Sequence, residues 1–128
     1  MTIARAAAHD SAAPVVDAER VAAARTGTPS PEEAMALSGL FRLLGDPTRA
    51  RILYALLAAG ELCVSDIAAT VGVSETTVSH ALRLLRTAGV VRARRAGRQM
   101  YYRLADEHVQ RLLELTREHA AHDTGRVR

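Results

Sequence analysis

Four side chains near the C-terminus have the types and the spacing of a metal site. Asp106 and His108 lie two residues apart, and His119 and His122 lie three residues apart, in the segment ADEHVQRLLELTREHAAHD. Residues three apart on a helix share a face, so the second pair can bind one ion. The first pair points apart within a helix but converges if Asp106 caps it, where the backbone is not yet helical. The segment therefore predicts a helix with half of a metal site at each end.

The two pairs cannot bind the same ion within one chain. His108 and His119 are eleven residues apart, which is roughly 16 Å along a helix, whereas a bond from zinc to imidazole is about 2 Å long. If two copies pack antiparallel across a two-fold axis, each pair meets the other pair of the second copy, and symmetry generates two four-ligand sites. One carboxylate and three imidazoles suit tetrahedral Zn(II), with Co(II) as a substitute. A metalloprotease motif, H-E-x-x-H, would need histidines four residues apart.

Cap residues divide the chain before this segment into short helices. Ser30 precedes Pro31 and is followed by Glu33, which is the order of a capping box. Asp46 caps a second helix, and Ser74 caps a later one. These helices end at glycine, and the predicted spans are 46–60, 64–72 and 74–89. The first helix carries apolar residues at helical spacing that are predicted to face the core: Leu37, Leu40, Phe41 and Leu44.

The pattern changes its period after Gly89. VVRARRAGRQMYYRL alternates apolar and polar residues on both sides of a turn at Gly97, which predicts antiparallel strands over 90–95 and 99–104. The last helix then spans about residues 106–121. The predicted fold class is therefore mainly α-helical with a small β-hairpin.

Length and composition limit the class of protein. A chain of 128 residues suits one domain, which we place at residues 30–123 between a flexible N-terminal arm over 1–29 and a flexible tail over 124–128. No apolar run reaches the ~20 residues needed to cross a bilayer, and the first residues do not form a secretory signal. The single cysteine, Cys63, agrees with a reducing compartment. We expect a cytoplasmic protein with no membrane partner.

The third and fourth helices have the pattern of a helix-turn-helix. In IAATVGVSETTVSHALRLLR, Ala68, Gly72 and Val78 supply the small, turn and buried positions at offsets that let two short helices cross closely. The second helix of such a pair presents its N-terminal part to base edges in the major groove. The residues of this helix predicted to contact DNA are Thr76, Thr77, Ser79, His80 and Arg83.

The basic residues, all 17 of them arginine, are concentrated beside this helix pair. Seven arginines and no acidic residue lie between Thr76 and Ala105, a charge distribution typical of a nucleic-acid surface. The hairpin over residues 90–104, called the wing below, is predicted to reach phosphates or the adjacent minor groove and to give salt-dependent affinity. Its predicted contacts are Arg94, Arg95, Arg98 and Gln99, and the expected partner is double-stranded DNA.

Five stretches carry a more specific pattern: LGDPTRARIL, ELCVSD, VGVSETTVSHALRLLRTAGVV, GRQMYYRLAD and DEHV. With them, residues 32–123 resemble the ArsR/SmtB family of metal-responsive bacterial repressors. The resemblance implies a winged helix-turn-helix homodimer that binds an operator of imperfect inverted symmetry and leaves it when metal binds. In the family's sensors of the last-helix type, metal ligands occupy the positions of Asp106, His108, His119 and His122.

Cys63 marks a candidate second metal site. In the resembled family, a cysteine at this place in ELCV joins a cysteine two residues on, or ligands from the N-terminal arm. Residue 65 of this chain is serine, so Cys63, Asp66 and His9 are the candidate ligands that remain. A buried, inert thiol is the competing interpretation.

The predicted function is that of a repressor and not of an enzyme. The homodimer binds operator DNA without metal and is released by Zn(II), and the resemblance implies that His119 directs its second N–H toward a backbone carbonyl near Ala88 or Gly89. Two alternatives stay open. One is the same scaffold answering cobalt, nickel, cadmium or oxidation of Cys63. The other is a structural zinc dimer or small hydrolase, which is disfavoured because no general base is evident beside the histidines.

Overall fold

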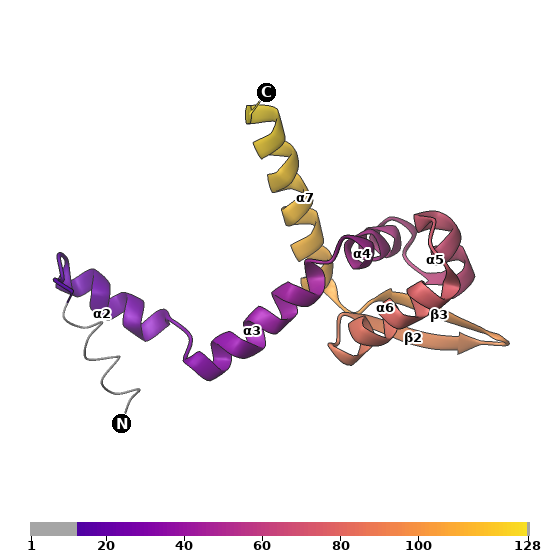
Figure 1. Cartoon of the computed structure of the whole chain (residues 1–128), viewed down its shortest axis with the longest axis horizontal. Helices are drawn as coiled ribbons and strands as arrows, with labels where there is room; N and C mark the ends of the chain where they lie inside the picture. Colours follow the sequence, from indigo (N-terminus) through magenta and orange to yellow (C-terminus); the bar gives the residue numbers. More distant parts are fainter. Residues whose placement is uncertain (1–12, 128) are drawn as a thin grey trace. The chain divides into compact units, whose positions relative to one another are not determined.

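The computed structural model describes residues 13–127 and contains helices and one small sheet (Figure 1). In chain order the elements are α2 (Ala18–Gly27), α3 (Pro31–Leu44), α4 (Pro47–Ala59), β1 (Leu62–Cys63), α5 (Val64–Val71), α6 (Glu75–Thr87), β2 (Val91–Ala96), β3 (Gln99–Leu104) and α7 (Glu107–Val127). The chain divides into two compact units, Met1–Ala36 and Leu37–Arg128. Each unit is described by itself.

The first unit contains α2 and the start of α3. The carboxylate of Asp17 accepts a hydrogen bond from the Arg20 amide and caps α2, which has no buried residue. The predicted cap of α3 is confirmed, because the Glu33 amide donates to Ser30 Oγ at 3.1 Å. Helix α2 lies in the segment assigned to a flexible arm, whose residues 1–12 are outside the described part. The division into arm, domain and tail stays a prediction.

The core of the second unit forms where α4, α5 and α6 pack on the sheet and on α7. The Asp46 carboxylate caps α4 by accepting from the Arg49 amide at 2.9 Å, which confirms the predicted start of this helix. The largest fully buried side chains come from α4, α5, α6 and β2: Ile52, Leu53, Leu56, Ile67, Val78, Leu82, Leu85 and Val91. Burying each of them contributes about 1.5–3 kcal/mol. No helix in residues 13–127 combines the length and the apolar character that a membrane span needs.

The prediction that the apolar stripe of α3 faces the core is wrong for three of its four residues. Leu37, Leu40 and Phe41 are exposed, the last of them to 68% of its surface, and only Leu44 is half-buried against the core. The spacing identified an apolar face correctly. It did not show what covers that face, because the spacing of apolar residues identifies the apolar side of a helix but not the element that packs on it.

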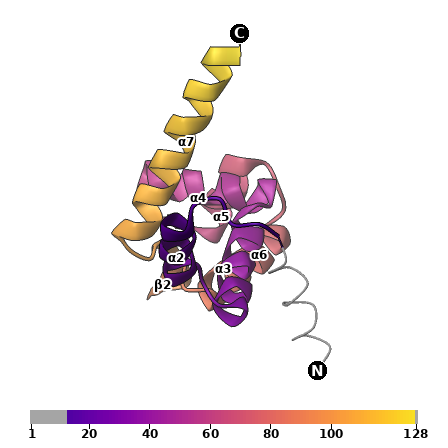
Figure 2. The ribbon, with the colours of Figure 1, turned by 90° about the vertical axis from the view of Figure 1, so that its left-hand side faces the viewer.

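The sheet has three antiparallel strands in the order β1-β3-β2, one more than the predicted hairpin. The hairpin register pairs Val91 with Leu104 and Arg94 with Tyr101, and β1 adds Cys63 opposite Tyr101. A strand of two residues is too short to produce a periodic pattern, so the sequence does not predict β1. Helix α7 is also longer than predicted, since it continues to Val127 and extends past the packed helices α4, α5 and α6 (Figure 2).

Candidate DNA-binding surface and metal-ligand helix

The turn between α5 and α6 has the backbone that a helix-turn-helix requires. Gly72 ends α5 in the left-handed conformation, with φ 72° and ψ 34°, and its amide donates to the Ala68 carbonyl at 2.8 Å. Residues with a Cβ adopt this conformation at a cost, so glycine fits the position. Ser74 then caps α6 by accepting from the Thr77 amide at 3.1 Å. Together these contacts fix the crossing of the two helices.

Helix α6 has one buried and one exposed face. Val78, Ala81, Leu82 and Leu85 are buried in the core. All of the predicted base contacts are on the exposed side: Thr76, Thr77, Ser79, His80 and Arg83. The Thr77 hydroxyl is 2.9 Å from the Ser74 hydroxyl, so it also takes part in the cap. The exposed face is therefore free to enter a groove, and the role of each residue there stays a prediction.

The wing presents Arg95, Arg98 and Gln99 as exposed residues, but Arg94 has a partner within the chain. Its guanidinium donates two hydrogen bonds to the Glu61 carboxylate, at 2.8 and 2.7 Å, and lies 5.0 Å from the centre of the Tyr101 ring. The hydrogen bond from Arg94 holds the pKa of the Glu61 carboxyl below its ordinary value, and the same bond raises the pKa of Arg94. The sequence did not point to Glu61, which is 33 residues away.

Asp106 occupies the cap of α7, the position that allows it to converge with His108. Its Oδ1 accepts from the Val109 amide at 3.0 Å and lies 3.7 Å from His108 Nδ1. That separation is too long for a hydrogen bond. The carboxylate and the exposed imidazole thus form an adjacent pair of oxygen and nitrogen donors.

The other predicted ligand pair lies near the far end of α7. His119 and His122 line one shallow pocket of about 440 Å³ together with Leu115 and Glu118. Within residues 13–127 of one chain, no three histidine, cysteine, aspartate or glutamate side chains come together to hold a metal ion. The donor set of Asp106 and three histidines suits Zn(II), but one chain supplies it as two separated pairs.

The three histidines predicted as ligands share an exposed stripe of α7 with two leucines. Its members are spaced alternately by four and three residues: His108, Leu112, Leu115, His119 and His122. This is the spacing of a helix face that packs on another helix. Leu112 and Leu115 are 38% and 52% exposed, whereas Leu113, on another side of α7, is buried in the core. The chain therefore leaves Leu115 and part of Leu112 exposed between the two predicted ligand pairs, although Leu112 also lines a pocket with Leu40 and Leu44 of α3.

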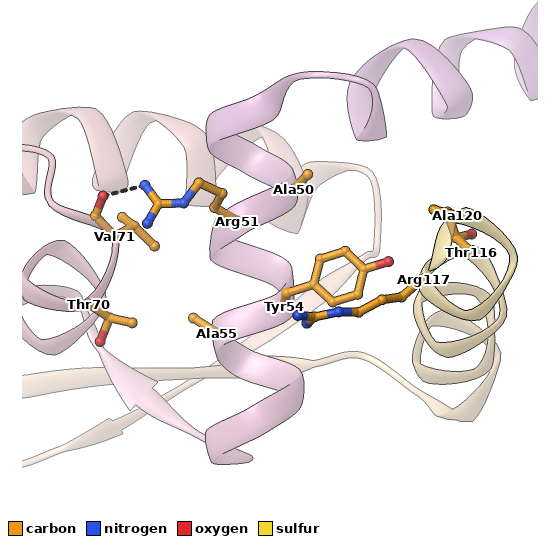
Figure 3. Close-up of a pocket in the computed structure, with 9 residues that line it drawn as sticks. All are labelled: Ala50, Arg51, Tyr54, Ala55, Thr70, Val71, Thr116, Arg117 and Ala120. Carbon is orange, nitrogen blue, oxygen red and sulfur yellow. Dashed lines mark hydrogen bonds between the residues drawn. The ribbon is translucent and has the colours of Figure 1, made fainter. Parts of the chain in front are cut away.

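A second side of α7 contacts α4. The Tyr54 hydroxyl donates to the Leu113 carbonyl at 2.7 Å, and the Arg117 guanidinium lies 5.4 Å from the centre of the Tyr54 ring. Arg51, one helical turn from Tyr54, donates to the carbonyl of Val71 at 2.6 Å. Figure 3 shows these side chains around a pocket of about 530 Å³ between α4, α5 and α7. The contacts connect α7 through α4 to the last residue before the Gly72 turn.

Ala88 and Gly89 line the same pocket as His108 and not the pocket lined by His119 of the same chain. A small pocket is lined by Ala88, Gly89, His108 and apolar residues of α3 and α7. His119 lies three turns further along α7 and lines a different pocket. A contact between His119 and these carbonyls would therefore have to be made across a dimer.

The candidate second metal site is not assembled within the described part of the chain. Cys63 is only 5% exposed, and its sulfur lies 3.4 Å from the Ser65 hydroxyl. Asp66 is exposed in the first turn of α5, and His9 lies outside the described residues. Burial and this short contact give Cys63 the surroundings of a structural thiol.

Comparisons with known proteins agree with this geometry. Residues 46–93 match the family model described as "Bacterial regulatory protein, arsR family". A "Transcriptional repressor SmtB homolog" from Synechocystis sp. is 43% identical over 106 residues, which cover 83% of this chain and 80% of that protein. The crystal structure of AntR, an antimony-specific transcriptional repressor, has a TM-score of 0.67 at 38% identity and covers 75% of this chain and 86% of that one.

A solved structure from Mycobacterium bovis is also similar. It is a homodimeric winged helix-turn-helix DNA-binding domain with a TM-score of 0.65 at 35% identity, covering 75% of this chain and 91% of that one. The predicted fold class, mainly helical with a small antiparallel sheet in a winged helix-turn-helix arrangement, is confirmed by these similarities. The relatives are regulators and not enzymes, as predicted for this chain.

Proposed function

Because the chain belongs to the ArsR family of bacterial regulatory proteins, we propose that it is a metal-responsive transcriptional repressor. It binds operator DNA of imperfect inverted symmetry as a metal-free homodimer. It is released when Zn(II) binds at two equivalent sites between the C-terminal helices. The observation that carries this proposal is the stripe of α7, in which two exposed leucines lie between the two ligand pairs.

The stripe supports an antiparallel pairing of two α7 helices. Two-fold symmetry brings the start of one helix beside the end of the other, so Asp106 and His108 of one copy face His119 and His122 of the second. The same pairing removes Leu112 and Leu115 from water. Dimerisation thus completes the donor set and covers the apolar surface in one step.

The side chains that the antiparallel pairing would bring together are of the types that bind zinc. Zn(II) accepts four nitrogen or oxygen ligands in tetrahedral geometry, and Co(II) accepts the same set. Asp106 is held by its bond from the Val109 amide, so its carboxylate is oriented before any ion arrives. The pair at the other end lies on one face of a helical segment, as shared coordination requires.

The DNA-binding part of the proposal is supported by exposure and charge. The outward face of α6 and the exposed arginines of the wing belong to one stretch without acidic residues, residues 76–105. Phosphate contacts from arginine give affinity, while the α6 residues contact base edges. In a dimer, the two α6 helices would contact successive major grooves.

Coupling between metal and DNA is proposed to cross the dimer interface. His108 lines one pocket with Ala88 and Gly89, the residues directly after α6. The His119 imidazole of the second copy, brought to the same place, can donate its second N–H to a carbonyl there. Release then requires that this contact favours a dimer arrangement with a lower affinity for DNA, worth several kcal/mol for an almost complete switch.

Oxidation of Cys63 is a less favoured signal than zinc. The thiol is almost fully buried and is in contact with the Ser65 hydroxyl, whereas redox-sensing cysteines are accessible. Cobalt, nickel and cadmium remain alternatives that titration separates. The structural zinc dimer without DNA affinity is excluded if the metal-free protein binds its operator.

Fluorescence anisotropy on the DNA upstream of the chain's own gene tests the proposal. We expect tight binding by the metal-free protein, loss of binding on zinc addition and recovery with a chelator. His119→Ala should keep metal-free binding and lose release by zinc, since one of the four ligands is missing. Gln110→Ala, on the solvent side of the same helix, is the matched control and should respond like the wild type. Release of DNA by zinc from the His119→Ala protein would contradict the proposed location of the zinc site.

A further inference from the structure

One of the four predicted DNA contacts of the wing is already engaged inside the chain. Arg94 on β2 donates to both oxygens of Glu61, at 2.8 and 2.7 Å, and passes over the ring of Tyr101 on β3. Glu61 directly precedes β1, the strand on the other side of β3. The side chain of Arg94 therefore reaches from β2 across β3 to the residue that precedes β1. A bidentate pair of this kind is geometrically specific as well as attractive.

The sheet register separates Arg94 from the other arginines of the wing. Directly paired residues of antiparallel strands point to the same side, so Arg94 shares a face with Tyr101. Arg95 pairs with Met100 and lies on the opposite face, the one that carries the buried Val91. Arg98 lies beyond β2, at the turn of the hairpin. The adjacent residues Arg94 and Arg95 thus have different surroundings, which the sequence RR does not show.

Glu61 is also placed to act on the helix-turn-helix. The chain passes from Glu61 through the two residues of β1 directly into α5, the first helix of the pair. A contact that holds β2 to Glu61 therefore holds the wing to the start of this helix pair. Without it, the hairpin is still held by backbone pairing with β1 over two residues and by packing of β2 and β3 on the helices, which leaves the exposed outer part of the wing without a side-chain clamp.

We propose that Arg94 and Glu61 are positioning residues that clamp the wing to the helix-turn-helix, and that Arg95 and Arg98, not Arg94, supply the phosphate contacts of the wing. This proposal rests on the DNA-binding function proposed above. It divides the arginines of one hairpin into one that fixes geometry and two that bind the ligand.

The salt dependence of DNA binding distinguishes the two roles. Each phosphate contact contributes about 0.9 to the slope of log affinity against log salt concentration, so a substitution in both wings of a dimer removes about 1.8. Arg95→Met and Arg98→Met should each lower the slope by about this amount. The double variant Glu61→Gln/Arg94→Met removes both charges of the clamp and keeps the local net charge. It should leave the slope unchanged and lower the affinity by a similar factor at every salt concentration.

Two outcomes would overturn the proposal. If the double variant loses about 1.8 from the slope, Arg94 contacts phosphate like its neighbours. If the double variant keeps both slope and affinity, the pair does not position the wing. Because both side chains are partly exposed, with 53% and 28% of their surfaces accessible for Arg94 and Glu61, the double variant is expected to fold.

A measurement without DNA separates this proposal from the proposed function. In the free protein, amide hydrogen exchange of the β2–β3 pairs around Tyr101 should become faster in the double variant, because the clamp between Arg94 and Glu61 is lost. Wild-type protein that binds no DNA would contradict the repressor function, and faster exchange would still support the clamp. Unchanged exchange in the double variant would contradict the clamp whether or not DNA binds.

Discussion

Replacing Leu115 by alanine tests the proposed dimer, on which the proposed metal site depends. Leu115 lies at the centre of the α7 stripe, between the two ligand pairs, and 52% of its surface is exposed in the single chain. Full burial of a leucine contributes about 1.5–3 kcal/mol, so covering the exposed half contributes about 0.8–1.5 kcal/mol per copy. A dimer contains two copies. At 1.4 kcal/mol per factor of ten, the dimer dissociation constant should rise about 10- to 100-fold.

Sedimentation equilibrium of the metal-free protein, with a chelator present, measures this change directly. Glu114→Ala is the matched control, because Glu114 is exposed on the same helix but outside the stripe. It should leave the dissociation constant within a factor of about two, as expected for a surface substitution. Circular dichroism should show the same helix content for all three proteins.

One outcome would contradict the proposed packing of the stripe. If Leu115→Ala and Glu114→Ala dimerise as tightly as the wild type, the stripe does not pack on a second copy. The ligand pairs would then never meet, because one chain keeps them three turns apart. A weaker dimer should also bind zinc less tightly at protein concentrations below its dissociation constant, since each site needs both chains.

Four further substitutions test individual parts of the fold. Gly72→Ala should lower the free energy of unfolding by about 1–2 kcal/mol in urea titration, because alanine is strained at a φ of 72°. Ile67→Ala should cost about 2–5 kcal/mol in the same assay, because Ile67 is fully buried. Tyr54→Phe keeps the ring and removes the bond to Leu113, so we expect a loss of about 0.5–1.5 kcal/mol by thermal unfolding. The hydrogen bond from Arg94 lowers the pKa of Glu61 from its ordinary 4.5. The ion pair therefore stabilises the fold above that pH, and this stabilisation is lost as the pH falls through the lowered pKa. The difference in the free energy of unfolding between wild type and Glu61→Gln should accordingly vanish in acid.

Local signals predicted the elements that position the site. The starts of α4 and α6 follow from Asp46 and Ser74, and the end of α5 follows from Gly72, because capping involves residues only a few positions apart. The same locality predicted Asp106 as the cap of α7. The sequence therefore contained both the helix-turn-helix and the pairing of Asp106 with His108.

Contacts between residues that lie far apart in the sequence could not be predicted from such local signals. The ion pair of Glu61 and Arg94 joins residues that share no periodic pattern, and strand β1 forms only because it pairs with β3. The exposed apolar face of α3 was assigned to the core, since spacing identifies an apolar face without identifying its partner. The proposed metal site has the same property, because its predicted ligands form two local pairs that lie far apart along α7.

Helix α7 contacts α4 on one side and is proposed to pack on a second copy through its stripe. These two sets of contacts connect the stripe to the helix-turn-helix. Its buried side is fixed to α4 by the bond from Tyr54 to the Leu113 carbonyl. Helix α4 in turn holds the end of α5 through the bond from Arg51 to Val71, immediately before the Gly72 turn. The two bonds therefore form a continuous path of contacts from α7 through α4 to the turn. If two copies pair through the stripe, as proposed, a change there is expected to reach α6 within each chain as well as across the interface.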